Sequence, residues 1–187
     1  VLNNGYFTGE SLKFTSDDRL CVPVPLYHCF GMVLSNIAAL THGAALIYPD
    51  EAFDPLSVLE AVQEEKCTGL HGVPTMFIAE LEHPRFKEFD LSSLRTGIMA
   101  GSPCPIEIMR RVVDEMYCSE MIIAYGMTET SPVITSSETD DPIEKQVSTV
   151  GSRFPPKEGK INDEHGRTVA PVQTGELFAS GYNVMQA

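Results

Sequence analysis

Residues 121–132 read Met-Ile-Ile-Ala-Tyr-Gly-Met-Thr-Glu-Thr-Ser-Pro, an apolar run followed by a polar loop. The run from Met121 to Ala124 has the length of a strand and is rich in residues that favour β structure. Gly126 breaks the run, and two threonines and a glutamate follow before Pro132. Because open α/β sheets bind ligands outside the carboxyl ends of their strands, this pattern is typical of a ligand-binding loop.

The residues of this loop have suitable chemistry for a nucleotide. Tyr125 offers a flat aromatic face, and Gly126 lets another group approach the backbone closely. Thr128 can donate a hydrogen bond to a phosphate oxygen, and Glu129 can hold a magnesium ion that is shared with phosphates. The alternative is a solvated turn between a strand and a loop, and for this stretch alone that alternative is favoured.

Composition limits the class of protein. The chain has 187 residues, 43% of them hydrophobic, which suffices for a sizeable core. The net charge of −13 argues against nucleic acids and anionic membranes as partners. No apolar run approaches the roughly 20 residues that span a bilayer, and no signal peptide is visible. Five cysteines without a C-x-x-C pair predict buried reduced thiols, and hence a reducing intracellular compartment, cytoplasmic or mitochondrial.

Predicted strands and helices alternate along most of the chain. Helices are expected to begin near residues 32, 55, 74 and 106, and the strands to cover residues 20–24, 44–48, 67–71, 96–100 and 121–124. Such alternation predicts an α/β fold with a mostly parallel sheet flanked by helices on both faces. Residues 1–19 carry polar and turn residues, and residues 135–149 are expected to form a surface loop.

The pattern changes after Val150. Helical signals end there, and short β segments rich in turn residues follow, such as residues 175–181. We therefore expect an α/β lobe over residues 1–149 and the start of a β-rich lobe over residues 150–187.

Three predicted loops follow three successive strands on the same side of the sheet. They are residues 72–74, 101–103 and 125–129, and each begins with or soon reaches a glycine. Short βα turns also use glycine for geometry alone, so each loop taken singly is better explained as structural. Together, the three loops predict a cleft for a nucleotide or another phosphorylated ligand.

The loop at residues 125–130 strongly resembles the signature of the adenylate-forming enzymes, which include acyl-CoA synthetases, luciferases and the adenylation domains of peptide synthetases. Further ordered segments are similar to motifs of the same family, namely Pro25–Gly31, Gly72–Phe77, Ala100–Pro103, Gly175–Leu177 and Gly181–Met185. The resemblance covers nearly the whole chain. It is greatest to the branch of medium-chain fatty acyl-CoA synthetases.

This resemblance implies a two-step reaction. A carboxylate attacks the α-phosphorus of ATP in the presence of Mg²⁺ to give an acyl-adenylate and pyrophosphate, and coenzyme A then displaces AMP. Tyr125 would stack on adenine, Thr128 would bond a phosphate oxygen, and Glu129 would coordinate magnesium. His28 would lie between the acyl pocket and the adenylate, as the third catalytic residue.

The resemblance also assigns the binding residues. The glycine, serine and proline at 101–103 would frame the adenine and ribose. The whole expected ATP or AMP site comprises Gly101, Ser102, Pro103, Ala124, Tyr125, Gly126, Met127 and Thr128. The expected acyl site comprises His28, Gly72, Val73 and Ala100.

Some parts of the family pattern do not match. The lysine-containing phosphate loop would lie before Val1, and the small domain with the catalytic lysine would follow Ala187. The 187-residue chain alone is therefore expected to be inactive. The match is looser around residues 154–161, where Gly159 is unusual inside a strand, and no site is assigned there.

Two other functions remain open. One is an adenylation enzyme that loads an aryl or amino acid onto a carrier protein. An amino acid substrate usually requires an aspartate in the pocket, and the residues near His28 and Ala100 include none, which favours a plain apolar acid. The other is a non-catalytic nucleotide-binding relative that uses the same sheet.

Overall fold

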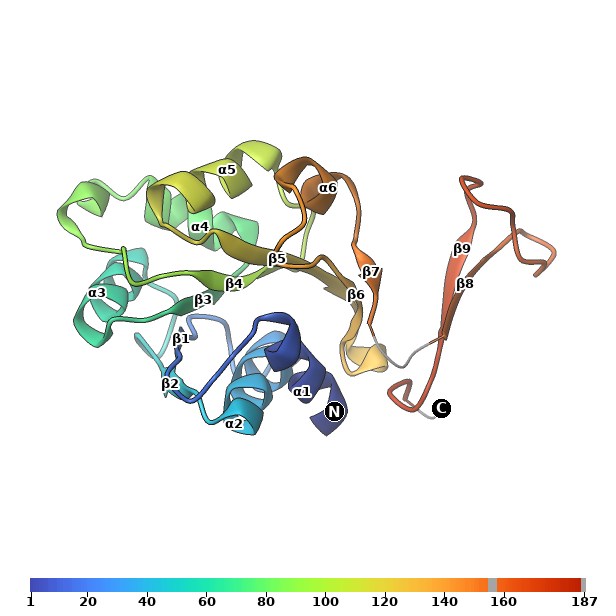
Figure 1. Ribbon diagram of the computed structural model, residues 1–187, viewed down its shortest axis with the longest axis horizontal. Helices are drawn as coiled ribbons and strands as arrows, with labels where there is room; N and C mark the ends of the chain where they lie inside the picture. Colours follow the sequence, from blue (N-terminus) through green and yellow to red (C-terminus); the bar gives the residue numbers. More distant parts are fainter. Residues whose placement is uncertain (155–157, 186–187) are drawn as a thin grey trace.

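The computed structural model of the chain describes residues 1–154 and 158–185 and contains a seven-stranded sheet between two layers of helices (Figure 1). The strand order is β2-β1-β3-β4-β5-β6-β7. The first five strands in the chain are parallel: β1 (Arg19–Cys21), β2 (Ala45–Ile47), β3 (Gly69–Gly72), β4 (Thr96–Ala100) and β5 (Glu120–Gly126). Strands β6 (Val133–Ser136) and β7 (Ser152–Arg153) add antiparallel pairs. The predicted fold class, a mostly parallel sheet with helices on both faces, is confirmed.

Helices from the two halves of the α/β region cover opposite faces of the sheet (Figure 1). One face carries α1 (Leu2–Ser11), the π-helix η1 (Phe30–Ile37) and α2 (Ala38–His42). The other face carries α3 (Pro55–Glu65), α4 (Pro74–Leu81) and α5 (Ile106–Glu115). Smaller helices are the 3₁₀ turns η2 (Phe86–Glu88) and η3 (Thr128–Thr130) and the helix α6 (Ile143–Ser148).

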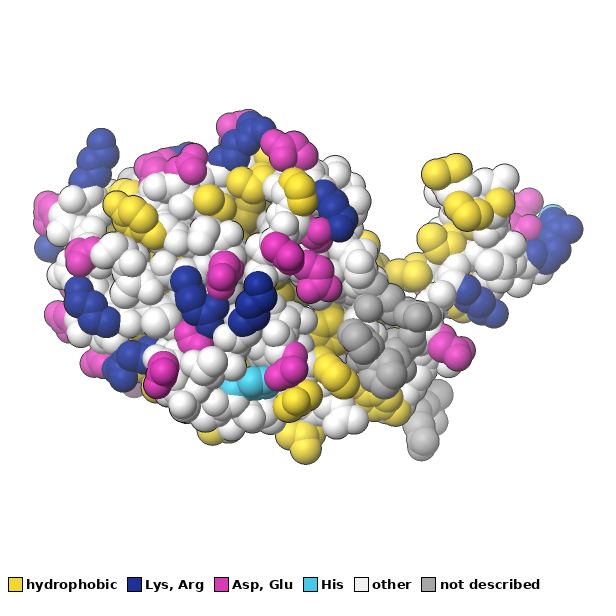
Figure 2. All heavy atoms as spheres, viewed as in Figure 1, with side chains coloured by type: hydrophobic (Ala, Val, Ile, Leu, Met, Phe, Trp, Pro, Cys, Tyr) yellow, Lys and Arg dark blue, Asp and Glu magenta, His cyan; other side chains and the backbone are white. Residues whose placement is uncertain are grey.

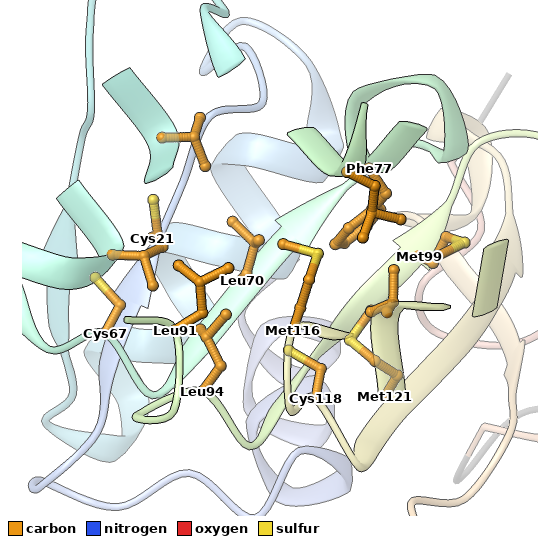
Figure 3. Close-up of a cluster of buried hydrophobic side chains, with 14 of the residues drawn as sticks. Cys21, Cys67, Leu70, Phe77, Leu91, Leu94, Met99, Met116, Cys118 and Met121 are labelled. Atoms are coloured by element: carbon orange, nitrogen blue, oxygen red, sulfur yellow. The ribbon is translucent and has the colours of Figure 1, made fainter. Parts of the chain in front are cut away.

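Each central strand supplies side chains to both hydrophobic cores. In β4, Ile98 packs with the α1 layer and Met99 with the α4 layer. Ile122 and Met121 of β5 divide in the same way. Figure 3 shows the core on the face covered by α3, α4 and α5, where Leu70, Phe77 and Met99 meet side chains from neighbouring elements. A strand buried on both faces reads as a continuous apolar run, which explains the pattern at residues 121–124.

Local sequence features explain two of the helix ends. The Asp54 side chain accepts a hydrogen bond of 2.8 Å from the Ser57 backbone N–H and caps α3, with Pro55 as its first residue. Gly43 ends α2 in the left-handed region, with φ of 72°. All five cysteines are free thiols. Cys21, Cys67 and Cys118 are buried as predicted, but Cys29 and Cys104 are partly exposed, so the prediction of buried thiols was wrong for these two.

Helix α1 was not expected, because residues 1–19 show polar and turn character. Its two glycines are explained by tertiary packing. A Cβ atom on Gly5 would lie 2.5 Å from Cγ2 of Ile37, and one on Gly9 would lie 2.3 Å from Nδ1 of His42. Glycine lowers helix propensity, but only glycine lets α1 approach the helices beneath it this closely.

The prediction of a surface loop at residues 135–149 was wrong in part. Strand β6 reaches Ser136, and α6 occupies Ile143–Ser148. Buried polar side chains serve the backbone here: Gln146 Nε2 donates to the carbonyls of Glu138 and Asp141, and Ser137 Oγ accepts from the Ile123 N–H at 2.9 Å. Some polar residues in this segment are therefore buried and hydrogen-bonded to the backbone, although polarity alone suggested an exposed loop.

The β-rich signals after Val150 correspond to two structures. Strand β7 still pairs with β6 in the large sheet, while β8 (Glu158–Asn162) and β9 (Glu176–Ser180) form a separate antiparallel pair. Gly159 lies inside β8, opposite Ala179, so its position in a strand is real. The hairpin projects from the rest of the chain in Figures 1 and 2, and hydrophobic side chains on it are exposed. Within the described ranges, no helix has the length and hydropathy to cross a bilayer.

Charged side chains hold the amino ends of four parallel strands together. Asp18, just before β1, is 4% exposed and accepts two hydrogen bonds from the Arg95 guanidinium, at 2.8 and 3.1 Å. Arg95 precedes β4 and also donates to Glu120 of β5 at 2.6 Å. Thr68, before β3, donates to Asp18 at 2.7 Å. Burial raises the pKa of Asp18, but the bonds from Arg95, Thr68 and Thr15 outweigh it and place the pKa below its usual value.

Replacing this carboxylate should destabilise the fold. Asp18→Asn leaves Arg95 without its buried anion, so we expect the free energy of unfolding at neutral pH to fall by about 1.5–3 kcal/mol. Because the folded pKa is lowered, the difference from wild type should be full above the ordinary pKa of 3.8 and should disappear as the pH falls through the lowered value. Urea unfolding across this pH range measures both effects.

The control for this prediction is Glu107→Gln, which breaks an exposed ion pair with Arg110. Exposed pairs contribute little, so its unfolding midpoint should stay near that of wild type. Equal effects of the two variants would contradict the role given to Asp18.

Candidate nucleotide-binding site

The parallel strands bring the predicted loops to one edge of the sheet. Strands β1, β3, β4 and β5 are neighbours, and their carboxyl ends point the same way (Figure 1). The turn with His28 follows β1, Gly101 and Ser102 follow β4, and Tyr125 and Gly126 end β5. The expectation that the loops share one edge of the sheet is therefore confirmed. The shared edge follows from the parallel pairing of the strands and does not depend on any single loop.

Gly126 allows the chain to turn back at the end of β5. A Cβ atom there would lie 1.9 Å from the Pro132 carbonyl oxygen, which is far too close for any other residue. The Met127 N–H donates to that same oxygen at 3.1 Å, and β6 begins one residue later. The loop is closed further by Thr130, whose hydroxyl donates to the Met127 carbonyl at 2.9 Å. Thr128 and Glu129 are thus exposed side chains on a hydrogen-bonded turn.

One cavity, the His28 cavity, has a volume of about 350 Å³. His28, Ala100, Thr128 and Glu129 all line it, as do Met127 and Gly126. The sequence did not point to its apolar wall, which is formed by Phe30, Leu34, Pro132 and Val133. Phe30 and Leu34 belong to η1. From the sequence, Phe30 was placed in the turn at residues 25–31, and Leu34 in a helix that begins near residue 32.

A second cavity, the Ser102 cavity, has a volume of about 590 Å³. Ser102 and Pro103 line it, together with Cys104, Ile123 and residues 147–150. The two cavities share Gly101, Ala124, Tyr125 and Gly126. Tyr125 is 40% exposed and therefore stands between two adjoining cavities with its ring available to a ligand.

His28 is held in a defined tautomer. The Phe30 backbone N–H donates to His28 Nδ1 at 3.0 Å, so the proton of the neutral ring is on Nε2. The neighbouring thiol of Cys29 lies 3.8 Å from the same Nδ1 and 3.5 Å from the Thr128 hydroxyl oxygen. Cys29 thus brings the turn after β1 into contact with the loop after β5, a contact that nothing in the sequence indicated.

A buried histidine, His71, packs against Phe30, which belongs to the wall of the His28 cavity. His71 is fully buried between the rings of Phe14 and Phe30, and burial lowers its pKa to about 3. Its Nδ1 lies 2.9 Å from the Ser35 hydroxyl, which also donates to the Phe30 carbonyl at 3.1 Å. A neutral His71 therefore helps to fix the π-helix and the position of Phe30.

Most of the predicted site residues meet at the two cavities, but two do not. Gly72 is buried in β3, where a Cβ atom would lie 3.0 Å from the ring of Phe77, so close packing explains this glycine. Val73 lies close to the loop after β4, because a Cβ atom added to Gly101 would lie 3.1 Å from Cγ1 of Val73. Neither lines either cavity, and their assignment to an acyl site stays a prediction.

The electrostatic character of the site is unusual for a phosphate ligand. Among the described residues that line the two cavities, none is a lysine or an arginine, and Glu129 supplies a negative charge. Polyphosphate binding here would require a cation between Glu129 and the phosphates. Oxygen ligands from a carboxylate and from phosphates are the ligands that Mg²⁺ prefers.

Comparison with known proteins gives a consistent result. A family model described as AMP-binding enzyme matches residues 1–187. The Aspergillus fumigatus protein named acyl-CoA ligase sidI is 47% identical over 184 residues, which cover 98% of this chain and 31% of that protein. The Danio rerio protein named medium-chain acyl-CoA ligase ACSF2, mitochondrial, is 43% identical over 188 residues, which cover 99% of this chain and 31% of that protein.

A solved structure agrees with these relatives. O-succinylbenzoate coenzyme A synthetase (MenE) from Bacillus subtilis, in complex with ATP and magnesium ion, superposes with a TM-score of 0.80 at 26% identity. The match covers 98% of this chain and 38% of that one. The chain spans about a third of the length of the curated relatives that it matches.

The steric role of Gly126 can be tested directly. Gly126→Ala forces a methyl group against the Pro132 carbonyl, so we expect a loss of about 1–3 kcal/mol in the free energy of unfolding, the usual cost of overpacking. Gly159→Ala is the control, because a Cβ atom there would meet only the Phe178 carbonyl, at 3.8 Å. Thermal unfolding of both variants measures the difference, and an unchanged Gly126→Ala protein would refute the proposed constraint.

Proposed function

Because the chain belongs to the AMP-binding enzyme family, we propose that the protein containing it is an acyl-CoA synthetase that activates a fatty acid, of medium chain length, with ATP. A carboxylate oxygen of the acid attacks the α-phosphorus of ATP, and the bond to the departing pyrophosphate breaks. The thiol of coenzyme A then attacks the carbonyl carbon of the acyl-adenylate, and AMP leaves.

The observation that carries this proposal is the pair of adjoining cavities on either side of Tyr125. We assign adenine and ribose to the Ser102 cavity, where the ring of Tyr125 can stack on the base. The acid and the α-phosphate then belong in the His28 cavity, between His28 and Thr128. The mixed anhydride would form where Gly126 leaves the backbone uncovered, at the junction that both cavities share.

The residues at the loop fit a role in holding phosphates and magnesium. Thr128 is exposed, and it would donate to a phosphate oxygen from a turn whose backbone is fixed by Thr130. The described residues contain no cluster of three or more metal-ligating side chains. Glu129 would therefore hold Mg²⁺ jointly with ATP oxygens and water, which is a common arrangement for this ion. When bound, the ion neutralises the charge that develops on the phosphates.

Apolar residues support a hydrocarbon substrate. Phe30, Leu34 and Val133 line the His28 cavity, and Glu129 is the one carboxylate among the described residues that line it. An amino acid would need a further anion to pair with its ammonium group. This favours a plain carboxylic acid over the alternative of an amino acid for a carrier protein. Because His28 Nδ1 accepts from the Phe30 N–H, Nε2 is the ring nitrogen that can donate to the carboxylate or to the developing oxyanion.

The isolated 187-residue chain should lack this activity. Catalysis of phosphoryl chemistry depends on preorganised cations, and neither cavity has a lysine or arginine among its described lining residues. We propose that the remaining part of the protein supplies them. The free thiols at Cys21, Cys67 and Cys118 favour a reducing compartment, cytosolic or mitochondrial.

ATP–pyrophosphate exchange by the whole protein tests the proposal. Acids of increasing chain length are compared with aryl acids and amino acids, and product release is then followed with coenzyme A or a carrier protein as the acceptor. We expect exchange that depends on a fatty acid, and transfer to coenzyme A. Exchange that depends on an amino or aryl acid would support the carrier-protein alternative, and nucleotide binding without exchange would support a non-catalytic relative.

The two polar side chains of the loop should be needed for turnover. Thr128→Ala removes a hydrogen bond to a charged oxygen, worth about 1.5–3 kcal/mol, and should lower kcat/KM about 10- to 150-fold. Glu129→Gln should lower it at least as much, with partial recovery at raised Mg²⁺. Glu138→Gln, an exposed carboxylate after β6, is the control. Steady-state kinetics that show wild-type turnover in both loop variants would rule out this role.

The stacking role of Tyr125 gives a separate prediction. Tyr125→Phe keeps the aromatic face and should bind ATP nearly as well as wild type. Tyr125→Ala should weaken the binding of ATP by about 1–3 kcal/mol, the usual contribution of base–aromatic stacking. Calorimetry of ATP binding to the whole protein distinguishes them. If both variants lose the same affinity, the hydroxyl group is responsible and stacking is not.

A further inference from the structure

The turn after β9, residues 181–185, returns to the loop that carries Glu129. The Met185 backbone N–H donates to the Glu129 carbonyl at 2.8 Å. The Ser131 hydroxyl donates to the Asn183 carbonyl at 2.7 Å, and Asn183 Nδ2 donates to the Thr130 carbonyl. Three hydrogen bonds thus join two segments that are more than fifty residues apart in the sequence.

The burial of Asn183 shows that this contact is specific. Asn183 is 3% exposed, while Tyr182 and Met185 in the same turn are 49% and 60% exposed. The Thr130 residue that it contacts is 4% exposed. Burying an amide is costly unless it is hydrogen-bonded, and Asn183 Oδ1 has no hydrogen-bond partner among the described residues. The bond from Nδ2 to the Thr130 carbonyl is therefore the hydrogen bond that offsets the cost of burying this amide.

The contact also completes the turn that presents the candidate magnesium ligand. Carbonyl groups at the end of a helical turn have no partner inside the turn. The carbonyls of Glu129 and Thr130 are in this position at the end of η3, and Met185 and Asn183 supply their donors. The backbone of Glu129 is fixed on one side by the loop and on the other by residues 183–185.

We propose that Asn183 is a positioning residue, which acts through the Thr130 carbonyl to hold Glu129 where it binds magnesium. This inference rests on the proposed function of Glu129. Asn183 itself contacts no substrate: it lines neither of the two cavities. Its effect is to fix the orientation of the turn, so its loss should be felt in the metal dependence and not in adenine binding.

Two variants approach the contact from opposite sides in the whole protein. Asn183→Ala removes the donor to Thr130, and Ser131→Ala removes the donor to the Asn183 carbonyl. Each should raise the Mg²⁺ concentration for half-maximal pyrophosphate exchange about 2- to 13-fold, the range that corresponds to one hydrogen bond. AMP binding without metal, measured by calorimetry, should stay at the wild-type value. Tyr182→Ala is the matched control in the same turn and should change neither quantity.

The outcomes separate positioning from a general structural role. A rise in half-saturating Mg²⁺ with unchanged AMP affinity supports the proposal. The proposal is overturned if AMP affinity falls by the same factor as the half-saturating Mg²⁺ concentration rises. It is also overturned if the half-saturating Mg²⁺ concentration is unchanged in both variants. If Asn183→Ala does not fold, Ser131→Ala gives the same reading.

A measurement without turnover separates this proposal from the proposed function. If the wild-type protein shows no acid-dependent exchange, the proposed function fails, but the contact can still be tested by hydrogen exchange. The amides of residues 128–131 and of Met185 should exchange several-fold faster in Asn183→Ala than in Tyr182→Ala. Equal exchange in the two variants overturns the positioning role, whatever the activity.

Discussion

The parallel pairing of β1, β3, β4 and β5 is the constraint on which the rest of the structure depends. Parallel strands place all their carboxyl ends at one edge and all their amino ends at the other. Asp18, Arg95 and Glu120 join the amino ends through charged hydrogen bonds. The carboxyl edge carries the loops instead, and their side chains remain available to ligands. The same sheet therefore has one edge for stability and one for chemistry.

A second constraint acts at the end of β5, where the chain reverses. The close approach of Gly126 to the Pro132 carbonyl lets β6 return antiparallel beside β5. This reversal projects Thr128 and Glu129 into solvent, while Thr130 is buried and holds the turn. The contact from Asn183 adds a tie to a distant segment. A side chain proposed to hold a metal ion is thus fixed through its backbone, which leaves its carboxylate free for the ligand.

The sequence predicted those features that depend on local pattern. The strand predicted at residues 96–100 is β4, and the helix predicted to begin near residue 55 is α3, which begins at Pro55. Features that depend on distant partners were missed. Helix α1 packs closely only because Gly5 fits against Ile37. Gln146 of α6 can be buried only because its side chain donates to a carbonyl of the preceding turn. The loops at residues 101–103 and 125–129 were found because they follow adjacent strands, whereas His28 and Ala100 were assigned from the resemblance to the adenylate-forming enzymes. Its apolar wall on η1 and the contact from Asn183 have no local pattern that would reveal them.

The proposed function requires that one ligand occupies both cavities, with Tyr125 at the junction. A crystal structure of the whole protein with a non-hydrolysable acyl-adenylate analogue, in which a sulfamate replaces the phosphate, tests it most directly. We expect adenine against the ring of Tyr125 in the Ser102 cavity and the acyl chain beside Phe30 in the His28 cavity. An adenine bound away from Tyr125, or an acyl chain outside the His28 cavity, would contradict it.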